Sequence, residues 1–231
     1  IHAALAAGIT HFDTAPVYGD GAAERLLGLA VAGCRGGVAL ATKCGLSHTP
    51  GGKPRIDLSR AAVLRDCEAS LARLGTDRLD LYLVHWPDPA VSFRETASAL
   101  RDLSRQGLIG GIGLCNYRFA ELRRAAEALG ELASVQYMYN LCTRGVETEI
   151  LPWCLANGVP LTAYSPLDQG VLAGGTLPSD FPVPGDPRSG NPDHTSRARR
   201  ETLAPVLEEL AALAGSSGYS PAALALGWVA S

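Results

Sequence analysis

Six short apolar segments alternate with amphipathic helical segments along most of this 231-residue chain, and this alternation limits the folds open to it. Strand followed by helix, repeated, is typical of βα units that build a parallel sheet. The predicted strands are Ile9–Asp13, Val38–Thr42, Leu79–Val84, Ile109–Leu114, Ser134–Gln136 and Pro160–Tyr164. The predicted helices are Ala22–Ala32, Ser59–Arg73, Arg94–Gln106, Arg118–Leu129, Val146–Asn157, Arg199–Ala214 and Pro221–Ala230. Ser59 is a suitable N-cap, and Gly75 supplies a stop signal for the same helix.

No Gly-x-Gly-x-x-Gly sequence follows any of these strands, which favours a closed barrel over a doubly wound nucleotide-binding sheet. We therefore predict an α/β fold of the (β/α)8 TIM-barrel type, formed as a single domain over residues 1–231. Such a barrel needs eight strands, and six are counted here. The first and eighth strands are expected to be missing, one before Ile1 and one after Ser231. The natural protein is then expected to extend past both ends.

Two segments stand apart from this alternation. Leu167–Ser196 is rich in Gly, Pro, Asp and Ser and has no apolar period. A loop of this length is usually either functional or disordered, so we expect one of these for this segment. At the front, Ile1–Ala7 has the pattern of the end of a helix.

Composition and charge exclude several classes of protein. Hydrophobic residues make up 47% of the chain and charged residues 19%, which allows a large core and is not typical of disorder. The formal net charge is −3, and the only basic cluster, formed by Arg197, Arg199 and Arg200, is typical of a solvated helix start. Neither nucleic acid nor an anionic membrane is therefore an expected partner. No apolar stretch reaches the roughly 18 residues that span a bilayer, and no secretory signal opens the chain.

Six cysteines, at positions 34, 44, 67, 115, 142 and 154, show neither CxxC spacing nor paired spacing with histidine. A disulfide framework is unexpected in a chain of this size, and a zinc site has no signature. Most of these cysteines lie in apolar sequence and are expected to be small core residues. They indicate a reducing, cytoplasmic location and no bound metal.

Polar or ionisable side chains follow every predicted strand, at the strand end that carries the chemistry in a barrel. In chain order they are Asp13 with Tyr18, Lys43, His85, Cys115 with Asn116, Gln136 with Asn140, and Tyr164 with Ser165. Each has a structural explanation by itself. Asp13 can cap a turn, Lys43 can extend to solvent, and His85 can be hydrogen-bonded in a tight turn. Their occurrence at every strand end indicates a functional site.

Four of these residues suit the reduction of a carbonyl group. A phenol has an ordinary pKa of about 10, and a nearby ammonium group lowers it by stabilising the phenolate. Tyr18 supplies the phenol, and Lys43 is the only lysine at a strand end. Asp13 is placed to keep that ammonium group charged, and His85 can hydrogen-bond the carbonyl oxygen. The set fits a reaction in which a carbonyl oxygen gains negative charge and then a proton.

Hydride addition is such a reaction, but no side chain can supply a hydride, so a cofactor must. Amide groups such as those of Asn116 and Gln136 can hold a carboxamide. An aromatic ring such as that of Tyr164 can stack on a nicotinamide. These residues together indicate a nicotinamide cofactor.

Four motifs follow one another along the chain. The first is GITHFDTAPVYG from Gly8, followed by Glu24, Leu27 and Gly28. The others are LVHWPDP from Leu83, SVQYMYN from Ser134 and YSPL from Tyr164. In sequence and order they resemble the motifs of the aldo-keto reductase family. The resemblance covers essentially the whole chain, and the opening motif is highly specific.

The resemblance implies an oxidoreductase that transfers a hydride from a nicotinamide cofactor to an aldehyde or ketone. Tyr18 would be the general acid, Lys43 would make it more acidic, and Asp13 would be the ion-pair partner of Lys43. His85 would orient the substrate.

The resemblance also implies how the cofactor is bound. Asn116 and Gln136 would hydrogen-bond the carboxamide, and Tyr164 would stack on the nicotinamide ring. The backbone from Ser165 to Leu167 would approach the pyrophosphate. The long segment after it resembles the flap that folds over the cofactor in the branch with potassium-channel β-subunits and many bacterial oxidoreductases.

Two features depart from the family pattern. Cys115 precedes Asn116 where the family usually has serine, and a thiol is a weaker hydrogen-bond partner than a hydroxyl. The carboxamide is then held less firmly, or Asn116 suffices. The family distinguishes its cofactors with residues after the eighth strand, which is expected beyond Ser231. The family preference favours NADP(H) over NAD(H).

Two other functions stay open. One is a cofactor-binding regulatory subunit, like the channel β-subunits, in which turnover is slow and incidental. The other is an aldolase barrel in which Lys43 forms a Schiff base. That function leaves Tyr18, Asn116 and Gln136 unexplained. The oligomeric state and the physiological direction of the reaction also stay open.

The small-molecule carbonyl substrate is not specified by these motifs. Its pocket walls are expected on loops, with Val17, Trp86 and Tyr117 as apolar candidates. Loops vary freely on this fold, so a sugar, an aryl aldehyde and a small ketone are all compatible with the sequence.

Overall fold

The structure, a computed structural model, describes residues 1–49, 52–174 and 197–231. The strands are β1 (His11–Asp13), β2 (Ala39–Cys44), β3 (Leu46–His48), β4 (Pro54–Ile56), β5 (Leu79–Val84), β6 (Ile109–Cys115), β7 (Ser134–Met138) and β8 (Leu161–Tyr164). The α-helices are α1 (His2–Ala6), α2 (Ala22–Val31), α3 (Arg60–Leu74), α4 (Phe93–Arg105), α5 (Phe119–Leu129), α6 (Ile150–Asn157), α8 (Arg197–Ser217) and α9 (Pro221–Ala230). Three short 3-10 helices complete the elements of the described residues: η1 (Arg35–Gly37), η2 (Gly145–Glu147) and η3 (Asp168–Ala173).

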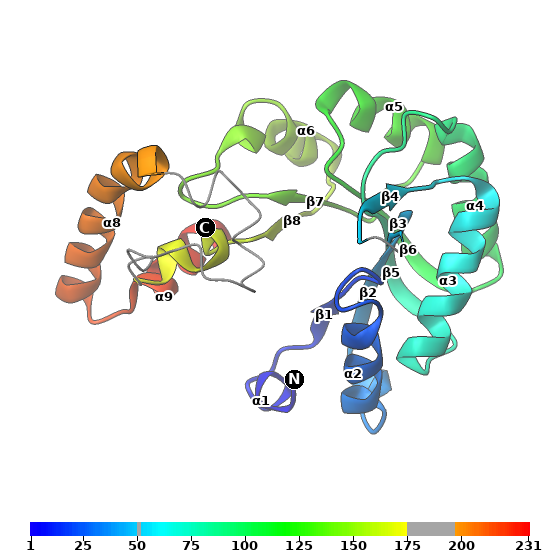
Figure 1. Ribbon diagram of the computed structural model, residues 1–231, viewed down its shortest axis with the longest axis horizontal. Helices are drawn as coiled ribbons and strands as arrows, with labels where there is room; N and C mark the ends of the chain where they lie inside the picture. The colour runs from blue at the N-terminus through cyan, green and yellow to red at the C-terminus, as the bar shows by residue number, and fades with distance from the viewer. Residues whose placement is uncertain (50–51, 175–196) are drawn as a thin grey trace. The chain divides into compact units, whose positions relative to one another are not determined.

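Six strands form one sheet in the order β1-β2-β5-β6-β7-β8, and the pairings from β1 to β7 are parallel. Strand order therefore follows chain order, without the reversal found in a doubly wound sheet. Consecutive helices from α2 to α5 pack against one another along the strands, as a barrel wound in one direction requires (Figure 1). The predicted (β/α)8 TIM-barrel type of fold is confirmed, with six strands in the main sheet of the described residues.

The chain divides into two compact units. One consists of Ile1–Gln136 and Pro152–Thr162, and the other of Tyr137–Leu151 and Ala163–Ser231. In the first unit, Ala41, Leu83 and Cys115 form a buried cluster between strands. In the second unit, Leu172 of η3, Leu210 of α8 and Ala225 of α9 form another. The expectation of a single domain over residues 1–231 stays a prediction.

The predicted segments agree with the structure except at several boundaries. β5 and α9 have the predicted bounds, whereas the predicted helix Val146–Asn157 is divided into η2 and α6. The predicted loop Leu167–Ser196 contains η3, and its residues 175–196 lie outside the described residues. The helical pattern at the front corresponds to α1. Within the described ranges, no helix is long and apolar enough to cross a membrane.

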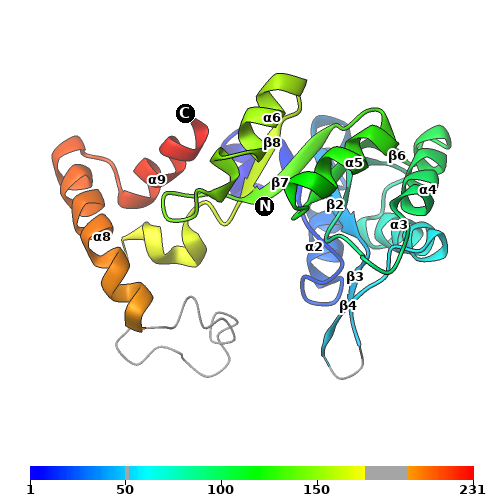
Figure 2. The same cartoon turned by 90° about the horizontal axis from the view of Figure 1, so that it is seen from above.

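The hairpin formed by β3 and β4 was not predicted. Each strand has three residues and β4 is exposed along its length, so neither carries the apolar alternation that marks a strand in sequence. Figure 2 shows the two strands projecting together from the first unit. The hairpin begins after Gly45, whose φ of +84° is a left-handed conformation that glycine adopts without strain.

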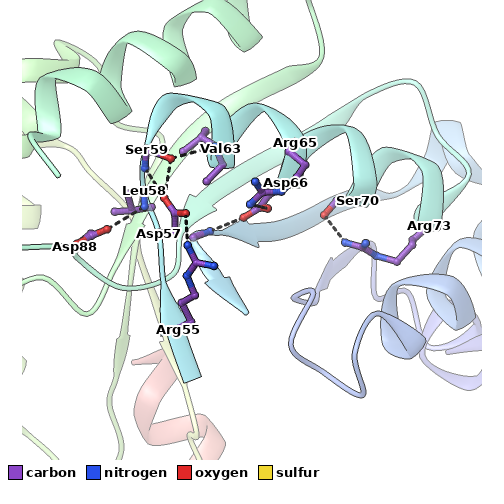
Figure 3. Close-up of polar contacts among 12 residues, drawn as sticks. Arg55, Asp57, Leu58, Ser59, Val63, Arg65, Asp66, Ser70, Arg73 and Asp88 are labelled. Atoms are coloured by element: carbon purple, nitrogen blue, oxygen red, sulfur yellow. Dashed lines mark hydrogen bonds and ion pairs between the residues drawn. The ribbon is translucent and has the colours of Figure 1, made fainter. Parts of the chain in front are cut away.

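The start of α3 links this hairpin to the segment after β5 (Figure 3). Ser59 caps the helix as predicted, with its Oγ accepting from Ala62 N at 3.4 Å. Asp57 Oδ1 in turn accepts from the Ser59 hydroxyl at 2.7 Å. Leu58 N donates to Asp88 Oδ2 at 3.1 Å, which fixes the turn that follows His85.

Helix α2 is held against β2 and α3 by a buried carboxylate. Glu24 is fully buried, and its two oxygens accept from Thr42 Oγ1 at 2.7 Å and from Arg73 Nε at 2.5 Å. A buried charge paired in this way avoids the large cost of an unpaired one. Gly28, one turn further along α2, permits the close approach to α3, because a Cβ atom there would overlap the backbone carbonyl of Leu74.

We predict that Gly28→Ala destabilises the protein by about 1–3 kcal/mol, since the added methyl group forces α2 away from α3. This cost exceeds the roughly 1 kcal/mol that alanine gains over glycine inside a helix. Gly33→Ala is the matched control, because nothing lies within 4 Å of a Cβ atom at Gly33. Chemical denaturation of the full-length protein measures both, and equal stabilities of the two variants would contradict this packing.

Candidate functional site

The parallel register places five of the predicted site residues on one face of the sheet. Side chains alternate between faces along a strand, and directly paired residues share a face. The pairs are Asp13 with Ala41, Lys43 with Leu83, Leu83 with Gly113, and Cys115 with Gln136. His85 continues the alternation of Leu81 and Leu83, which pack with Cys115 inside the sheet. Asp13, Lys43, His85, Cys115 and Gln136 therefore face the same side at the carboxyl ends of their strands.

Lys43 is the centre of this group. Its side chain is 1% exposed, and its Nζ lies 2.6 Å from Asp13 Oδ2 and 2.9 Å from the backbone oxygen of Thr14. An unpaired buried ammonium group would be very costly, and these two oxygens provide the compensation. The predicted Asp13–Lys43 ion pair is thus present in the geometry.

Tyr18 and His85 lie beside this ion pair. Lys43 Nζ is 5.2 Å from the centroid of the Tyr18 ring. The Tyr18 and His85 rings meet edge to face, with centroids 6.2 Å apart and planes at 90°. Tyr18 is 44% exposed, so its ring is accessible to a small molecule. The structure therefore brings all four residues of the predicted catalytic group together.

His85 is only 9% exposed, and burial together with the charge of Lys43 lowers the pKa of its imidazole to about 4. The ordinary value is about 6.5, so the ring is neutral at neutral pH and offers one N–H donor and one acceptor nitrogen. Its Nδ1 is buried and has no hydrogen-bond partner within the described part of the chain. The ring can therefore serve as a neutral hydrogen-bonding group.

Cys115 and Gln136 contact each other at the next two strand ends. Cys115 is fully buried and Gln136 is 5% exposed. Burial raises the pKa of the Cys115 thiol to about 12, so the group is protonated at neutral pH. Its Sγ lies 3.7 Å from Gln136 Oε1 and donates a weak hydrogen bond to it. The thiol thus contacts the amide of a second predicted cofactor residue.

Asn116 follows directly after β6 in a left-handed conformation, with φ of +63°. Its backbone N donates to the oxygen of Gln136 at 3.2 Å, and its side-chain Nδ2 donates to the backbone oxygen of His85 at 3.0 Å. The role predicted for the Asn116 side chain is a hydrogen bond to the carboxamide of the cofactor. The contact with His85 was not predicted, because no sequence pattern identifies a bond to a backbone oxygen of a distant residue.

The remaining predicted cofactor residues belong to the second unit. The backbone oxygen of Tyr164, at the end of β8, accepts from Tyr139 N at 3.4 Å. Ser165 has φ of +50°, and its backbone oxygen accepts from the buried Asn140 Nδ2 at 3.0 Å. Leu167 packs against the cluster around Leu172. The backbone of this turn is thus fixed locally by Asn140 and by apolar packing.

Thr14 is a member of the site that the sequence did not single out. It is 3% exposed, and its backbone oxygen is one of the two groups that hold Lys43. Its Oγ1 is buried without a hydrogen-bond partner among the described residues. The only feature of the sequence that could have indicated this contact with Lys43 is the position of Thr14 directly after Asp13.

A cavity of about 1000 Å³ opens beside the site in the first unit. Trp86, Asn116 and Tyr117 are among the residues that line it. Two of the three predicted pocket walls, Trp86 and Tyr117, thus share one cavity, whereas Val17 does not line it. The cavity is also lined by charged residues of α4 and α5. None of the predicted catalytic residues, Asp13, Tyr18, Lys43 and His85, lines it, so the cavity is distinct from their site.

Comparison with known proteins adds an independent observation. The sequence model of the Aldo/keto reductase family matches residues 1–231. Methylglyoxal reductase YeaE of Escherichia coli (strain K12) is 39% identical over 180 residues, which are 77% of this chain and 60% of that protein. Aldo-keto reductase YhdN of Bacillus subtilis (strain 168) is 35% identical over 232 residues, covering 99% of this chain and 69% of that protein. The chain thus spans less than two thirds of the length of the Escherichia coli relative.

Solved structures resemble the chain as well. The glycerol dehydrogenase AKR11B4 from Gluconobacter oxydans matches with a TM-score of 0.90 and 32% identity, over 99% of this chain and 70% of that one. An aldo/keto reductase from Klebsiella pneumoniae in complex with NADP and acetate matches with a TM-score of 0.73 and 31% identity, over 98% and 68% of the two chains.

The environment of His85 predicts how folding stability depends on pH. The folded protein binds a proton at His85 only near pH 4, whereas the unfolded chain binds one near pH 6.5. Proton binding therefore stabilises the unfolded state relative to the folded state as the pH falls. Stability should therefore be intact above about pH 6.5 and decline by about 3 kcal/mol between pH 6.5 and 4. His85→Gln should reduce this decline, and the exposed His11→Gln should leave it unchanged. Urea unfolding at a series of pH values measures this, and equal pH slopes for wild type and His85→Gln would contradict it.

Proposed function

The chain belongs to the aldo/keto reductase family, and on that premise we propose that it reduces an aldehyde or ketone with a hydride from a nicotinamide cofactor, with Tyr18 as general acid. One observation carries the proposal. The buried ammonium group of Lys43 lies 2.6 Å from Asp13 and 5.2 Å from the ring centroid of an accessible tyrosine. A fixed positive charge beside a phenol suits proton donation to an oxygen that becomes negatively charged.

Each residue has a separate task in this proposal. Tyr18 donates its phenolic proton to the carbonyl oxygen as charge develops there. Lys43 stabilises the phenolate that remains, and Asp13 keeps Lys43 charged inside the protein. His85, which is neutral at the pH of the reaction, donates a hydrogen bond to the carbonyl oxygen and orients the substrate.

The residues of the site fit a nicotinamide cofactor, which when bound supplies the hydride. Gln136 and Asn116 present amide groups at neighbouring strand ends, which suit an uncharged carboxamide. We propose that they hold this group with Cys115 behind Gln136, that Tyr164 stacks on the ring, and that the backbone from Ser165 to Leu167 approaches the pyrophosphate. The Klebsiella pneumoniae relative in complex with NADP supports NADP(H) over NAD(H) as the cofactor.

The names of two relatives narrow the substrates worth testing. One is a methylglyoxal reductase and one a glycerol dehydrogenase, and both names refer to short oxygenated molecules. We propose small aldehydes and ketones with a neighbouring oxygen as the first substrate class. Oxidation of NADPH and of NADH by the full-length protein with such compounds tests this. Turnover too slow to follow would instead favour a cofactor-binding regulatory subunit.

We also propose that the protein works in the cytoplasm. All six cysteines lie in the described residues as free thiols, and four of them are buried. Unpaired cysteines in a chain of this size are typical of a reducing compartment. Fractionation of the source cells with antibody detection would test this location.

Removal of the Tyr18 hydroxyl tests the general acid. Tyr18→Phe should lower kcat by on the order of 10²–10⁴, a barrier rise of roughly 3–5 kcal/mol, because the oxygen receives no proton from the enzyme. Cofactor affinity, measured by fluorescence quenching, should stay nearly unchanged. Tyr219→Phe, at a position 65% exposed, is the matched control. Activity of Tyr18→Phe within about threefold of wild type would remove Tyr18 from the mechanism.

Replacement of Lys43 tests the source of the acidity. Lys43→Met removes the charge that stabilises the phenolate, so kcat for carbonyl reduction should fall strongly. Lys53→Met, at an exposed position, should leave kcat unchanged. An unchanged kcat in Lys43→Met would show that the ion pair is only structural.

A further inference from the structure

The hydrogen bonds around His85 show how its backbone is fixed. Its N donates to the oxygen of Cys44 at 3.1 Å, and its oxygen accepts from Asn116 Nδ2 at 3.0 Å. The first bond joins His85 to the strand that carries Lys43. The second joins it to the residue that follows β6. Both backbone polar groups of His85 are therefore held from opposite sides.

The bond from Asn116 replaces a rung of the sheet. The pairing of β5 with β6 ends at Val84 and Leu114, one residue before His85. Asn116 then turns to β7, where its backbone N donates to Gln136. Its left-handed φ of +63° permits this turn, and asparagine adopts that conformation more readily than most residues. Its side chain reaches back to β5, so the link to His85 continues where the backbone ladder has stopped.

We propose that Asn116 is a positioning residue for His85. Its hydrogen bond to the backbone of His85 connects the proposed carboxamide-binding residues to the residue proposed to orient the substrate. The proposal rests on the function proposed above and assigns Asn116 a task besides binding the cofactor. The His85 ring has no hydrogen-bond partner at Nδ1 among the described residues, so backbone anchoring and packing hold its direction. Loss of the Asn116 amide removes one of the two backbone anchors.

The test uses Asn116→Gly, because glycine keeps the left-handed backbone and removes only the side chain. Asn157→Gly is the matched control, since Asn157 Nδ2 also donates to a backbone oxygen, that of Trp153 at 2.8 Å, on an exposed helix end. Each variant is made in the full-length protein with and without His85→Gln. kcat and KM for an aldehyde at saturating NADPH are measured, together with the Kd for NADPH.

A residue that acts through His85 should lose its effect when His85 is replaced. We expect Asn116→Gly to lower kcat/KM for the aldehyde by about 3- to 10-fold, the size of one hydrogen bond. In the His85→Gln background, Asn116→Gly should lower kcat/KM by less than about twofold. Asn157→Gly should have no effect in either background. Equal losses in both backgrounds would overturn the proposal, because Asn116 would then act on the cofactor alone.

A second measurement needs no turnover. The protein has five histidines, and His85→Gln identifies the ring resonances of His85 by their disappearance from the proton spectrum. In wild type these resonances should not titrate above about pH 5, because the pKa of His85 is lowered to about 4. In Asn116→Gly the midpoint should move upward as the ring gains access to water. An unchanged midpoint and unchanged shifts would overturn the positioning role.

The two measurements separate the failure of this inference from failure of the proposed function. A wild-type protein without cofactor-dependent turnover would refute the proposed reaction, and the resonances would then decide the role of Asn116. Should Asn116→Gly not unfold cooperatively, Asn116→Asp replaces it in the kinetic comparison, because aspartate has nearly the same shape, also tolerates the left-handed backbone, and lacks the N–H donor. The His85 midpoint is not compared for this variant, because a carboxylate beside an imidazole raises the pKa of the ring by itself. Asn157→Asp then serves as its control.

Discussion

Burial of a charged ammonium group sets the conditions for the rest of the site. Lys43 lies inside the sheet with 1% exposure, which is tolerable only because Asp13 and the backbone oxygen of Thr14 accept hydrogen bonds from its ammonium group. Burial, together with this charge, lowers the pKa of the His85 imidazole and keeps it neutral. It also lies next to the Tyr18 ring, where it can stabilise a phenolate. One costly group thus places a fixed positive charge beside both neighbouring rings.

The register of the parallel strands decides which side chains share this environment. Ala41, Leu83 and Cys115 form a buried cluster, and Lys43 and His85 follow two positions after Ala41 and Leu83 on the same face. A shift of one residue in a single pairing would turn Lys43 toward the helices and Thr42 toward the interior. Apolar packing and site geometry are therefore two consequences of one register.

The helices contribute by fixing the segments between strand ends. Glu24 is buried between Thr42 and Arg73 and locks α2, the helix that follows Tyr18, against β2 and α3. Asp88 holds the turn after His85 by accepting from Leu58. These contacts restrict the backbone that follows Tyr18 and the backbone that follows His85. Such restriction keeps reacting groups oriented before a substrate binds.

The sequence by itself determined the alternation of strands and helices, the barrel type and the residues at the strand ends, because these depend on local periodicity, caps and turns. It pointed to Asp13, Tyr18, Lys43 and His85 through their places at strand ends, the chemistry of their side chains and the motifs around them. The hairpin of β3 and β4 was not predicted, since strands of three mostly exposed residues show no apolar alternation. Only the tertiary structure decided the bond from Asn116 to His85 and the contact of Cys115 with Gln136. Both depend on which strands become neighbours and in which register, and that is set by packing over the whole sheet.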